Sequence, residues 1–239
     1  MTDASSLRRT LALWFPYLPA DRLRQQEPDR CVSASALPDA ALVFVAKQKN
    51  ALRLAAVDAA AQALGLAPGM ALADARVRVP CLIAVEADAA ADRHWLELLA
   101  RSCTRFSPHV VPHPPDAIAI DIAGCEHLFG GEAGLVEALA EHVEQRGMTA
   151  RIACAATAEA ALALARHARL PVADEGKAIR ALPVMALGLD EEATLGLVRA
   201  GLKSIGAVAA RPRAALAARF GIEAVRALER LLGEEHRPG

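Results

Sequence analysis

The chain has 239 residues and a formal charge of −1, with 54% hydrophobic, 23% charged and only 3% aromatic residues. This balance is typical of a globular protein with a sizeable core. The near-zero net charge excludes nucleic-acid binding that is driven by the overall charge of the protein. The low aromatic content leaves few side chains on which bases would stack. Any contact with DNA therefore needs a local patch of positive charge.

The cysteines indicate a reducing compartment. They are odd in number and widely spaced, without a Cys-x-x-Cys pair, which argues against a disulfide framework and against a zinc site. They are Cys31, Cys81, Cys103, Cys125 and Cys154. The apolar run near the N-terminus is too short to cross a membrane, and no signal-peptide pattern follows it. We therefore expect a cytoplasmic protein without membrane contact.

In the first half of the chain, short apolar runs alternate with helical segments. The runs predict strands because they have strand length and end at turn residues. These strands are residues 11–15, 41–46, 53–57 and 82–85. The expected helices are residues 20–26, 59–64 and 71–76 and a longer one that ends at Cys103. Asp88 is the expected N-cap of that longer helix, and Gly65 suits the end of the second.

The most informative stretch is residues 112–131, PHPPDAIAIDIAGCEHLFGG. Ile118, Ile120 and Ile122 alternate with smaller or polar residues, which predicts a strand. Asp116 precedes this strand and Asp121 lies within it, and two carboxylates near one strand are compatible with a divalent-metal site for nucleotidyl transfer. The spacing alone favours a simpler interpretation, a Pro-rich turn before a core strand with one capping or solvated Asp.

The second half changes character after Leu170-Pro171. Before that point a helix over 132–146, a strand over 150–155 and a helix over 158–168 continue the irregular alternation, which indicates a mixed α/β sheet domain. From Asp190 onward the pattern predicts short helices separated by glycines, and basic residues outnumber acidic ones. Helix starts after such glycines can present free backbone N–H groups to a phosphate, although a solvated helical subdomain fits equally well.

The order of these predicted strands and helices resembles the catalytic half of Y-family (translesion) DNA polymerases. It resembles more closely the ImuB branch of that family, whose active sites have degenerated. IDIAGCEHLFGGE is similar to the palm strand, turn and helix of the family, and LALWFPYLPADRL to its first palm strand. GLAPGM resembles the end of the fingers, and ALPVMALGLDEE and GLKSIGAVAARPRAALAARFG resemble the two thumb hairpins. The similarity extends from about Leu11 to Leu232.

The resemblance implies an α/β (α+β) fold with a palm built on a mixed, ferredoxin-like sheet, a small fingers subdomain and a helical thumb with helix-hairpin-helix elements. We expect the palm at residues 7–16 and 86–174, the fingers at 17–85 and the thumb at 175–239. We expect the little finger domain of the family to be absent. The same holds for the C-terminal region that carries the sliding-clamp motif in ImuB proteins.

The resemblance also implies that the active site has degenerated. Trp14 stands where active members place the first metal-binding carboxylate, and Pro16 stands at a second acidic or polar position. Asp116 keeps a metal-ligand position, while Ala117 replaces the catalytic Glu beside it. The positions that would gate or hold an incoming nucleotide carry Pro19, Ala59, Gln62 and Glu159. Because two-metal transfer needs several anionic ligands, we expect no polymerase activity and no bound cofactor or metal.

The thumb keeps more of the pattern of the family. Gly188-Leu189-Asp190 replaces the first Gly-Ile-Gly, which weakens that phosphate cradle, and the second hairpin matches better. The expected DNA-contact positions are Gly188, Gly201, Lys203, Ser204, Gly206, Arg211 and Arg213. They imply a weak, sequence-independent grip on the DNA backbone that weakens with salt.

The function implied is that of a non-catalytic adaptor in damage-induced, error-prone translesion synthesis. The implied partners are DNA, an ImuA-type RecA-like protein, an error-prone replicative-type polymerase subunit and the sliding clamp. Two alternatives remain open. One is a weakly active transferase in which Asp116 and Asp121 act with Asp58 or Glu86, and the other is a protein-only scaffold without DNA contact.

Overall fold

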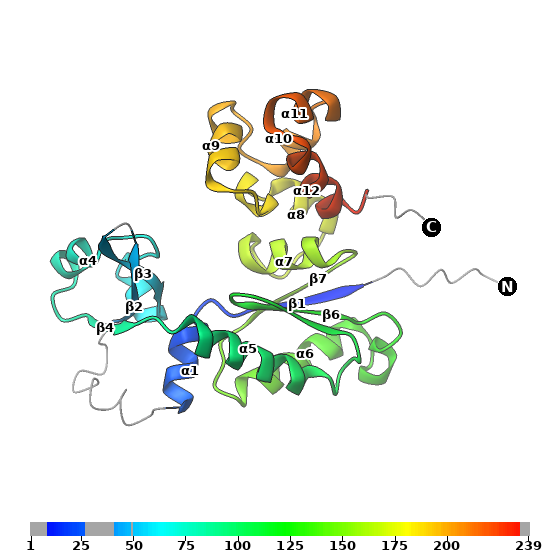
Figure 1. The fold of residues 1–239 in the computed structure, drawn as a ribbon. Coiled ribbons are helices and arrows are strands. Elements are labelled where there is room, and N and C mark those ends of the chain that lie inside the picture. The colour runs from blue at the N-terminus through cyan, green and yellow to red at the C-terminus, as the bar shows by residue number, and fades with distance from the viewer. Residues whose placement is uncertain (1–8, 27–40, 49, 235–239) are drawn as a thin grey trace.

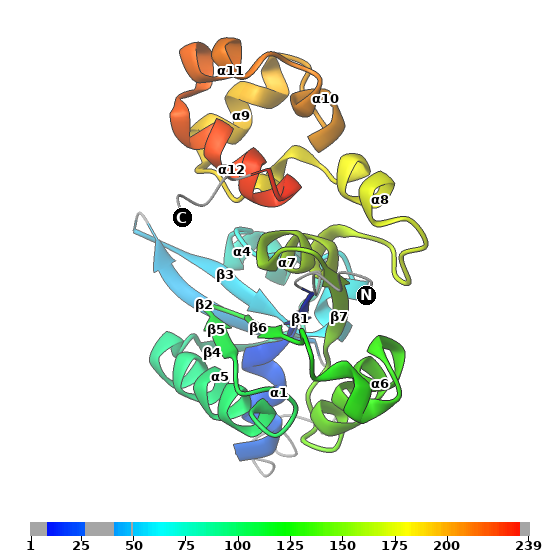
Figure 2. The same ribbon diagram turned by 90° about the vertical axis from the view of Figure 1, so that its right-hand side faces the viewer.

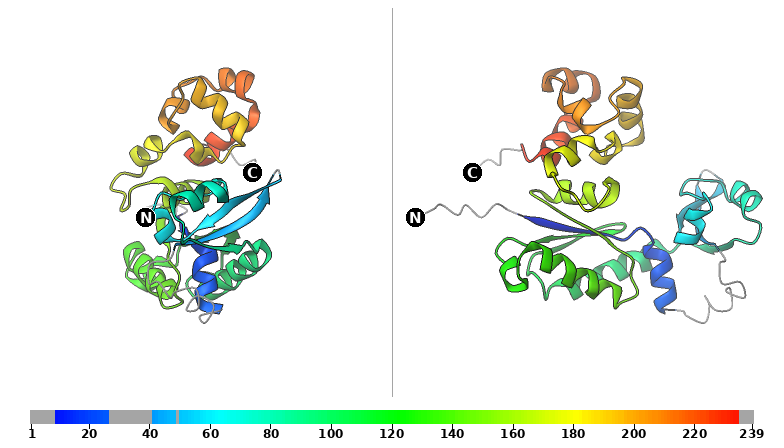
Figure 3. Two further views of the ribbon diagram at one scale, coloured as in Figure 1. Left: turned by 90° about the vertical axis from the view of Figure 1, so that its left-hand side faces the viewer. Right: turned by 180° about the vertical axis from the view of Figure 1, so that it is seen from behind.

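The computed structural model describes residues 9–26, 41–48 and 50–234. It contains a four-stranded sheet with helices on both faces, a smaller three-stranded sheet and a group of short helices (Figure 1). Figure 3 shows from behind that the short helices stand over α7 (Ala158–His167), while the smaller sheet lies beyond α1 (Leu18–Gln26).

The four-stranded sheet has the order β5-β6-β1-β7. Its strands are β1 (Thr10–Trp14), β5 (Val110–His113), β6 (Ala117–Asp121) and β7 (Arg151–Ala155). Every neighbouring pair is antiparallel, which corrects the expected mixed strand directions of this sheet. The reason is that the crossover through α6 (Glu132–Glu144) places β6 and β7 on either side of β1, so these two parallel strands never pair.

The expected alternation along β6 is confirmed, and it decides which helix covers which face. Large side chains such as Leu13, Ile118 and Ile120 point toward α5 (Ala89–Cys103) and α6. The opposite face carries alanines, including Ala12 and Ala117, and packs against the Ala-rich α7. Figure 2 shows α7 above the sheet and α5 and α6 below it. Small side chains allow α7 to lie close to the strands, as dense interior packing requires.

The three-stranded sheet has its own small core. It consists of β2 (Leu42–Gln48), β3 (Ala51–Val57) and β4 (Ile83–Glu86), with α3 (Ala59–Ala63) and α4 (Leu72–Arg78) beside it. β2 pairs with β3 in antiparallel fashion and with β4 in parallel fashion, so the mixed strand directions occur here. The strands and helices expected over this part of the sequence are therefore present, with ends shifted by one or two residues.

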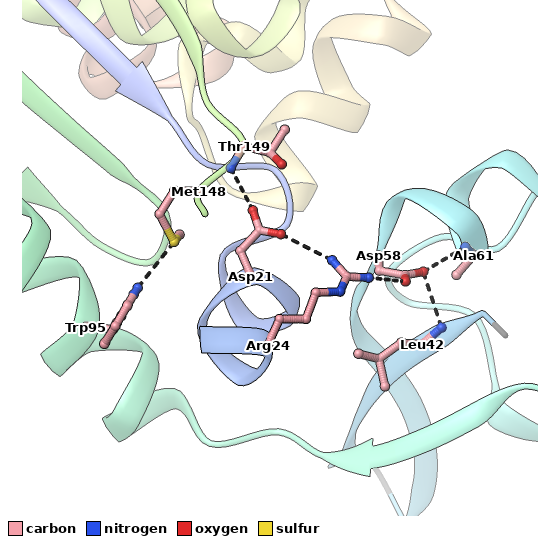
Figure 4. Close-up of polar contacts among 8 residues, drawn as sticks. All are labelled: Asp21, Arg24, Leu42, Asp58, Ala61, Trp95, Met148 and Thr149. Carbon is pink, nitrogen blue, oxygen red and sulfur yellow. Dashed lines mark hydrogen bonds and ion pairs between the residues drawn. The ribbon is translucent and has the colours of Figure 1, made fainter. Parts of the chain in front are cut away.

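A polar chain joins the two sheets through α1 (Figure 4). The carboxylate of Asp21 accepts a hydrogen bond from the Thr149 backbone N–H at 2.8 Å and an ion pair from Arg24 at 3.2 Å. Arg24 also reaches the buried carboxylate of Asp58 at 2.7 Å. Asp58 in turn caps α3 by accepting from the Ala61 N–H at 2.8 Å. The contacts therefore run from the loop between α6 and β7, through α1, to the smaller sheet.

The short helices share a core with α7. They are α8 (Glu175–Ala181), α9 (Glu191–Arg199), α10 (Ile205–Ala209), α11 (Arg213–Phe220) and α12 (Ile222–Leu232), with the 3-10 turn η2 (Val184–Leu187) between α8 and α9. From residue 190 to 234 the structure contains helices and turns but no strand, as the sequence predicts.

Two further expectations concern cysteines and membranes. Cys81, Cys103, Cys125 and Cys154 are free thiols, and Cys31 lies outside the described residues. Within the described ranges, no helix is both long and apolar enough to cross a membrane.

Candidate functional site at the end of the first strand

A cavity of about 430 Å³ lies where β1 ends, between the four-stranded sheet, α1 and the smaller sheet. It brings together five of the eight positions that the family pattern singles out, from three separate segments of the chain. These are Trp14, Pro16, Pro19, Gln62 and Asp116. Much of the remaining wall is apolar, with Phe44, Val57, Pro68, Pro114 and Pro115 among the lining residues. The volume falls in the range of small-molecule pockets.

Both carboxylate oxygens of Asp116 are engaged by other side chains. The Trp14 indole donates its Nε1–H to Oδ2 at 2.9 Å, and the Arg166 guanidinium donates to Oδ1 at 2.6 Å. The side chains of Asp116 and Arg166 are each about one-third exposed, at 29% and 31%. Asp116 is therefore the centre of a small, partly solvated ion pair.

The strand register explains this arrangement. Trp14 lies opposite Ala117 on β6 and opposite Arg151 on β7, and the Phe15 N–H donates to the backbone oxygen of Asp116 at 2.9 Å. The Arg151 guanidinium stands over the Trp14 ring, 5.6 Å from its centroid, and also donates to the Ala168 backbone oxygen at the end of α7. The end of α7, which carries Arg166, is thereby tied to the end of β1.

The other predicted positions lie around this centre without joining it. Ala117 is fully buried in β6, and Ala59 is exposed at the start of α3. Gln62 accepts a hydrogen bond from the Tyr17 hydroxyl at 2.5 Å. Glu159 is exposed in the first turn of α7. None of Ala59, Ala117 and Glu159 belongs to the cavity lining.

His113, at the end of β5, lies close enough to Arg166 and Glu159 for their charges to affect its pKa. Burial lowers the pKa of His113, and the positive charge of Arg166 lowers it further, whereas Glu159 acts in the opposite direction. His113 is therefore mainly neutral near pH 7, so it adds little positive charge to the site.

The residues present do not fit a two-metal site. Asp116 and Asp121 stand at opposite ends of β6, roughly 16 Å apart along a five-residue strand. Asp58 is a buried cap paired with Arg24, and Glu86 is the last residue of β4. In residues 9–26, 41–48 and 50–234, no three His, Cys, Asp or Glu side chains come together as a metal site would require. The alternative of a transferase with rebuilt ligands is therefore not supported.

The two hairpins of the helical group present less positive charge than their sequences suggest. Gly188 and Gly201 both have positive φ, 67° and 80°, and each ends a helical turn, as a left-handed glycine does. After Gly188, α9 begins with the cap Asp190 followed by Glu191 and Glu192, whose negative charges oppose an incoming phosphate.

In the second hairpin, several residues that were predicted to contact DNA instead make contacts within the protein. The Ser204 hydroxyl caps α10 by accepting from the Ala207 N–H at 3.2 Å. A Cβ on Gly206 would lie 3.0 Å from the Arg180 backbone oxygen, so glycine allows α10 to approach α8 closely. Arg213 pairs with Glu234 at 2.7 Å. Lys203 and Arg211 are exposed, and within the described part of the chain neither forms an ion pair.

The residues that sequence reasoning missed are Arg166 and Arg151. Their contacts with Asp116 and Trp14 connect positions far apart along the chain, and no local motif links them. The only sequence feature that could have pointed to Arg166 is that α7 ends with the basic residues Arg166 and His167. Basic residues are common at helix C-termini, so this feature does not indicate a functional site.

Comparison with known proteins adds independent findings. A family model described as IMS, the impB/mucB/samB family, matches residues 32–166. Among curated relatives, Protein ImuB of Caulobacter vibrioides (strain NA1000 / CB15N) is 45% identical over 174 residues, which cover 71% of this chain and 38% of that protein. DNA polymerase IV of Dehalococcoides mccartyi (strain CBDB1) is 24% identical over 210 residues, covering 84% of this chain and 54% of that protein. The chain thus spans about two-fifths to one-half of these relatives.

Solved structures share the fold. DinB from Sulfolobus solfataricus superposes with a TM-score of 0.71 at 14% identity, covering 96% of this chain and 68% of that chain. The insertion ternary complex of Dbh DNA polymerase gives a TM-score of 0.74 at 14% identity, with 96% and 69% covered. At this identity the match establishes a polymerase-like fold and nothing further.

Proposed function

Because this chain belongs to the impB/mucB/samB family and has an ImuB-type, Y-family polymerase-like fold, we propose that it is a non-catalytic adaptor module of error-prone translesion DNA synthesis. It holds DNA, partner proteins or both, while another polymerase performs nucleotide transfer. The four-stranded sheet with its helices acts as the palm (7–16 and 86–174), the smaller sheet as the fingers (17–85) and the helical group as the thumb (175–239).

The observation that carries the proposal is that both carboxylate oxygens of Asp116 already accept hydrogen bonds from other side chains. In active members of the family, divalent cations held by several carboxylates align and neutralise the transferred phosphoryl group. Here the remaining carboxylate accepts hydrogen bonds from Trp14 and Arg166, and the neighbouring positions carry Pro16 and Ala117. A single carboxylate that is already paired with an arginine does not provide that set of ligands.

The proposed loss of catalysis extends to the nucleotide positions. Ala59 and Gln62 carry no positive charge, and Glu159 would repel a triphosphate. The cavity wall is largely apolar, and Arg93 is the one cation among its lining residues in the described part of the chain. These features support a module that lacks nucleotide binding as well as nucleotide transfer.

DNA contact through the helical group is the second part of the proposal. The similar Dbh polymerase was solved in an insertion ternary complex, and Lys203 and Arg211 are exposed cations at the hairpin of this chain that matches the family pattern better. Two cations and a few backbone amides give a weak grip on phosphates, without sequence preference and with strong salt dependence.

The test is fluorescence anisotropy of a labelled primer–template against the chain at increasing salt. We expect binding that weakens steeply with salt, and Lys203→Glu should reduce affinity and lower the salt slope by about one unit, as loss of one phosphate contact predicts. The double variant Lys203→Glu/Arg211→Glu should lose about two units of slope.

The matched control is Arg101→Glu. Arg101 is an exposed residue of α5, below the palm sheet, and its substitution changes the net charge as Lys203→Glu does. An equal loss for both variants would show that only net charge matters. Absence of binding even at low salt would favour the protein-only scaffold.

The partners proposed by resemblance are an ImuA-type RecA-like protein, an error-prone replicative-type polymerase subunit and the sliding clamp. None of the residues described above is assigned to them. The four free thiols suit the reducing cytoplasm in which such an assembly would act.

A further inference from the structure

We propose that the Arg166 guanidinium is a built-in cation that takes the place of a metal ion on Asp116 and keeps this carboxylate closed to divalent cations. The inference rests on the proposed function but goes further. Without carboxylates at the positions of Trp14 and Ala117, Asp116 alone could still bind a cation weakly. The ion pair with Arg166 prevents this weak binding as well.

The geometry around the carboxylate supports this assignment. Arg166 donates to Oδ1 at 2.6 Å and Trp14 donates to Oδ2 at 2.9 Å, so each oxygen of the partly exposed carboxylate already accepts from a proton donor. Charge-assisted hydrogen bonds of this kind are the stronger class in proteins. A cation on either oxygen would have to displace a donor or lie beside a full positive charge.

The surrounding charges act in the same direction. Arg151 on β7 lies over the Trp14 ring, 5.6 Å from its centroid, and so places a second positive charge on the side chain that donates to Asp116. His113 on β5 is uncharged near neutral pH, and Glu159 lies exposed at the opposite end of α7 from Arg166. The carboxylate of Asp116 therefore has a full positive charge, that of Arg166, as its direct partner, which is the opposite of the charge balance that a divalent ion requires.

Arg166 is also held in position. Arg151 donates to the backbone oxygen of Arg166 at 3.3 Å and to that of Ala168, which fixes the end of α7 against β7. Preceding residues of α7, such as Ala161 and Leu164, are fully buried between the sheet and the short helices. The guanidinium is therefore presented to Asp116 by a rigid helix rather than by a loop.

The two tryptophans make a direct test possible. The chain contains only Trp14 and Trp95, so a ¹⁵N-labelled sample gives two indole signals. Trp14 touches Asp116, whereas Trp95 packs on the other face of the sheet with its indole N–H 3.3 Å from the Met148 sulfur. Paramagnetic Mn²⁺ broadens signals close to where it binds, so Trp14 reports on Asp116 and Trp95 serves as the internal reference.

We expect millimolar Mn²⁺ to broaden the two indole signals of the natural chain equally. In Arg166→Ala, and more strongly in Arg166→Glu, the Trp14 signal should broaden at least about tenfold more than that of Trp95. Adding Asp116→Asn to either variant should abolish the difference. Arg169→Ala and Arg169→Glu are the matched controls, because Arg169 is exposed three residues further on and makes the same change in net charge.

Selective broadening of Trp14 in the natural chain would overturn the proposal, since Arg166 would then not exclude the cation. Equal broadening of both indoles in Arg166→Ala and Arg166→Glu would also overturn it, provided that circular dichroism shows folded variants. Neither readout depends on polymerase activity or on DNA binding. The inference can therefore fail while the proposed function stands, and the reverse also holds.

Discussion

At the residue scale, His142 shows how a pair that looks catalytic can be structural. Its Nε2 lies 3.0 Å from the Ser102 hydroxyl, the distance of a Ser–His dyad. However, Arg146 can only donate, and it donates to His142 Nδ1 at 3.1 Å. The ring proton must therefore be on Nε2 and point to the Ser102 oxygen, while the Ser102 proton goes to the Leu99 backbone oxygen at 2.7 Å. In this tautomer His142 has no lone pair to accept a proton from Ser102.

This arrangement requires a neutral ring, which gives a pH prediction. Burial lowers the pKa of His142, and the positive charges of Arg146 and Arg105 lower it further. Because the unfolded chain binds this proton more readily, the free energy of unfolding should fall as pH decreases from about 7 through the ordinary histidine range near 6.5. Urea unfolding at several pH values should show a steeper loss for the natural chain than for His142→Gln, whose side chain does not titrate.

The comparison isolates one group because His113 and His167, whose pKa values are also lowered, are present in both proteins. Parallel pH profiles for the natural chain and His142→Gln between pH 7 and 5 would contradict the account.

At the element scale, the connection between the two sheets depends on Asp58. Its buried carboxylate accepts from the backbone N–H groups of Leu42 and Ala61 and pairs with Arg24. Removing it leaves the two backbone donors without this acceptor and leaves Arg24 with Asp21 as its remaining carboxylate partner. Asp58→Ala should therefore cost about 2–4 kcal/mol in the free energy of unfolding, measured by urea denaturation.

The matched control is Asp88→Ala at the start of α5. Asp88 is exposed and accepts only from the Ala91 N–H, at 2.9 Å, so its removal should cost about 1 kcal/mol. Asp58→Asn keeps an oxygen for the cap and should lie between the two. Equal losses for Asp58→Ala and Asp88→Ala would show that the contact with Arg24 contributes nothing.

The element scale is also where sequence reasoning succeeded best. The alternation of Ile118, Ile120 and Ile122 predicted β6 and its buried face, and the Asp88 cap predicted the start of α5. Trp14, Pro16 and Asp116, which the family register singled out, line one cavity in the structure. Local periodicity and capping are properties of neighbouring residues, so one sequence suffices to recognise them.

The parts that sequence reasoning missed are long-range contacts between side chains. The pairing of Arg166 with Asp116 joins residues fifty positions apart, and the pairing of Arg213 with Glu234 neutralises a cation that the sequence suggested for DNA. The strand directions predicted for the four-stranded sheet were also wrong, because they depend on how α6 crosses over β1. Such features are set by tertiary packing, which leaves no local pattern.

At the scale of the whole molecule, the fold is polymerase-like, and the proposed functional centre holds an internal ion pair. The proposed palm, fingers and thumb surround a cavity with apolar walls, and Asp116 at its edge is paired with Arg166. The exposed cations of the second thumb hairpin remain available for a DNA backbone. The central claim is therefore that the chain holds DNA without adding nucleotides.

Primer extension tests this claim most directly. The labelled primer–template should be saturated with the chain, as verified by anisotropy, and supplied with all four deoxynucleotides and either Mg²⁺ or Mn²⁺. We predict no extension beyond the level seen with Asp116→Asn, which removes the one carboxylate kept at a metal-ligand position of the family pattern and exposes any contaminating polymerase. Extension by the natural chain that disappears in Asp116→Asn would contradict the account, because Asp116 would then take part in catalysis.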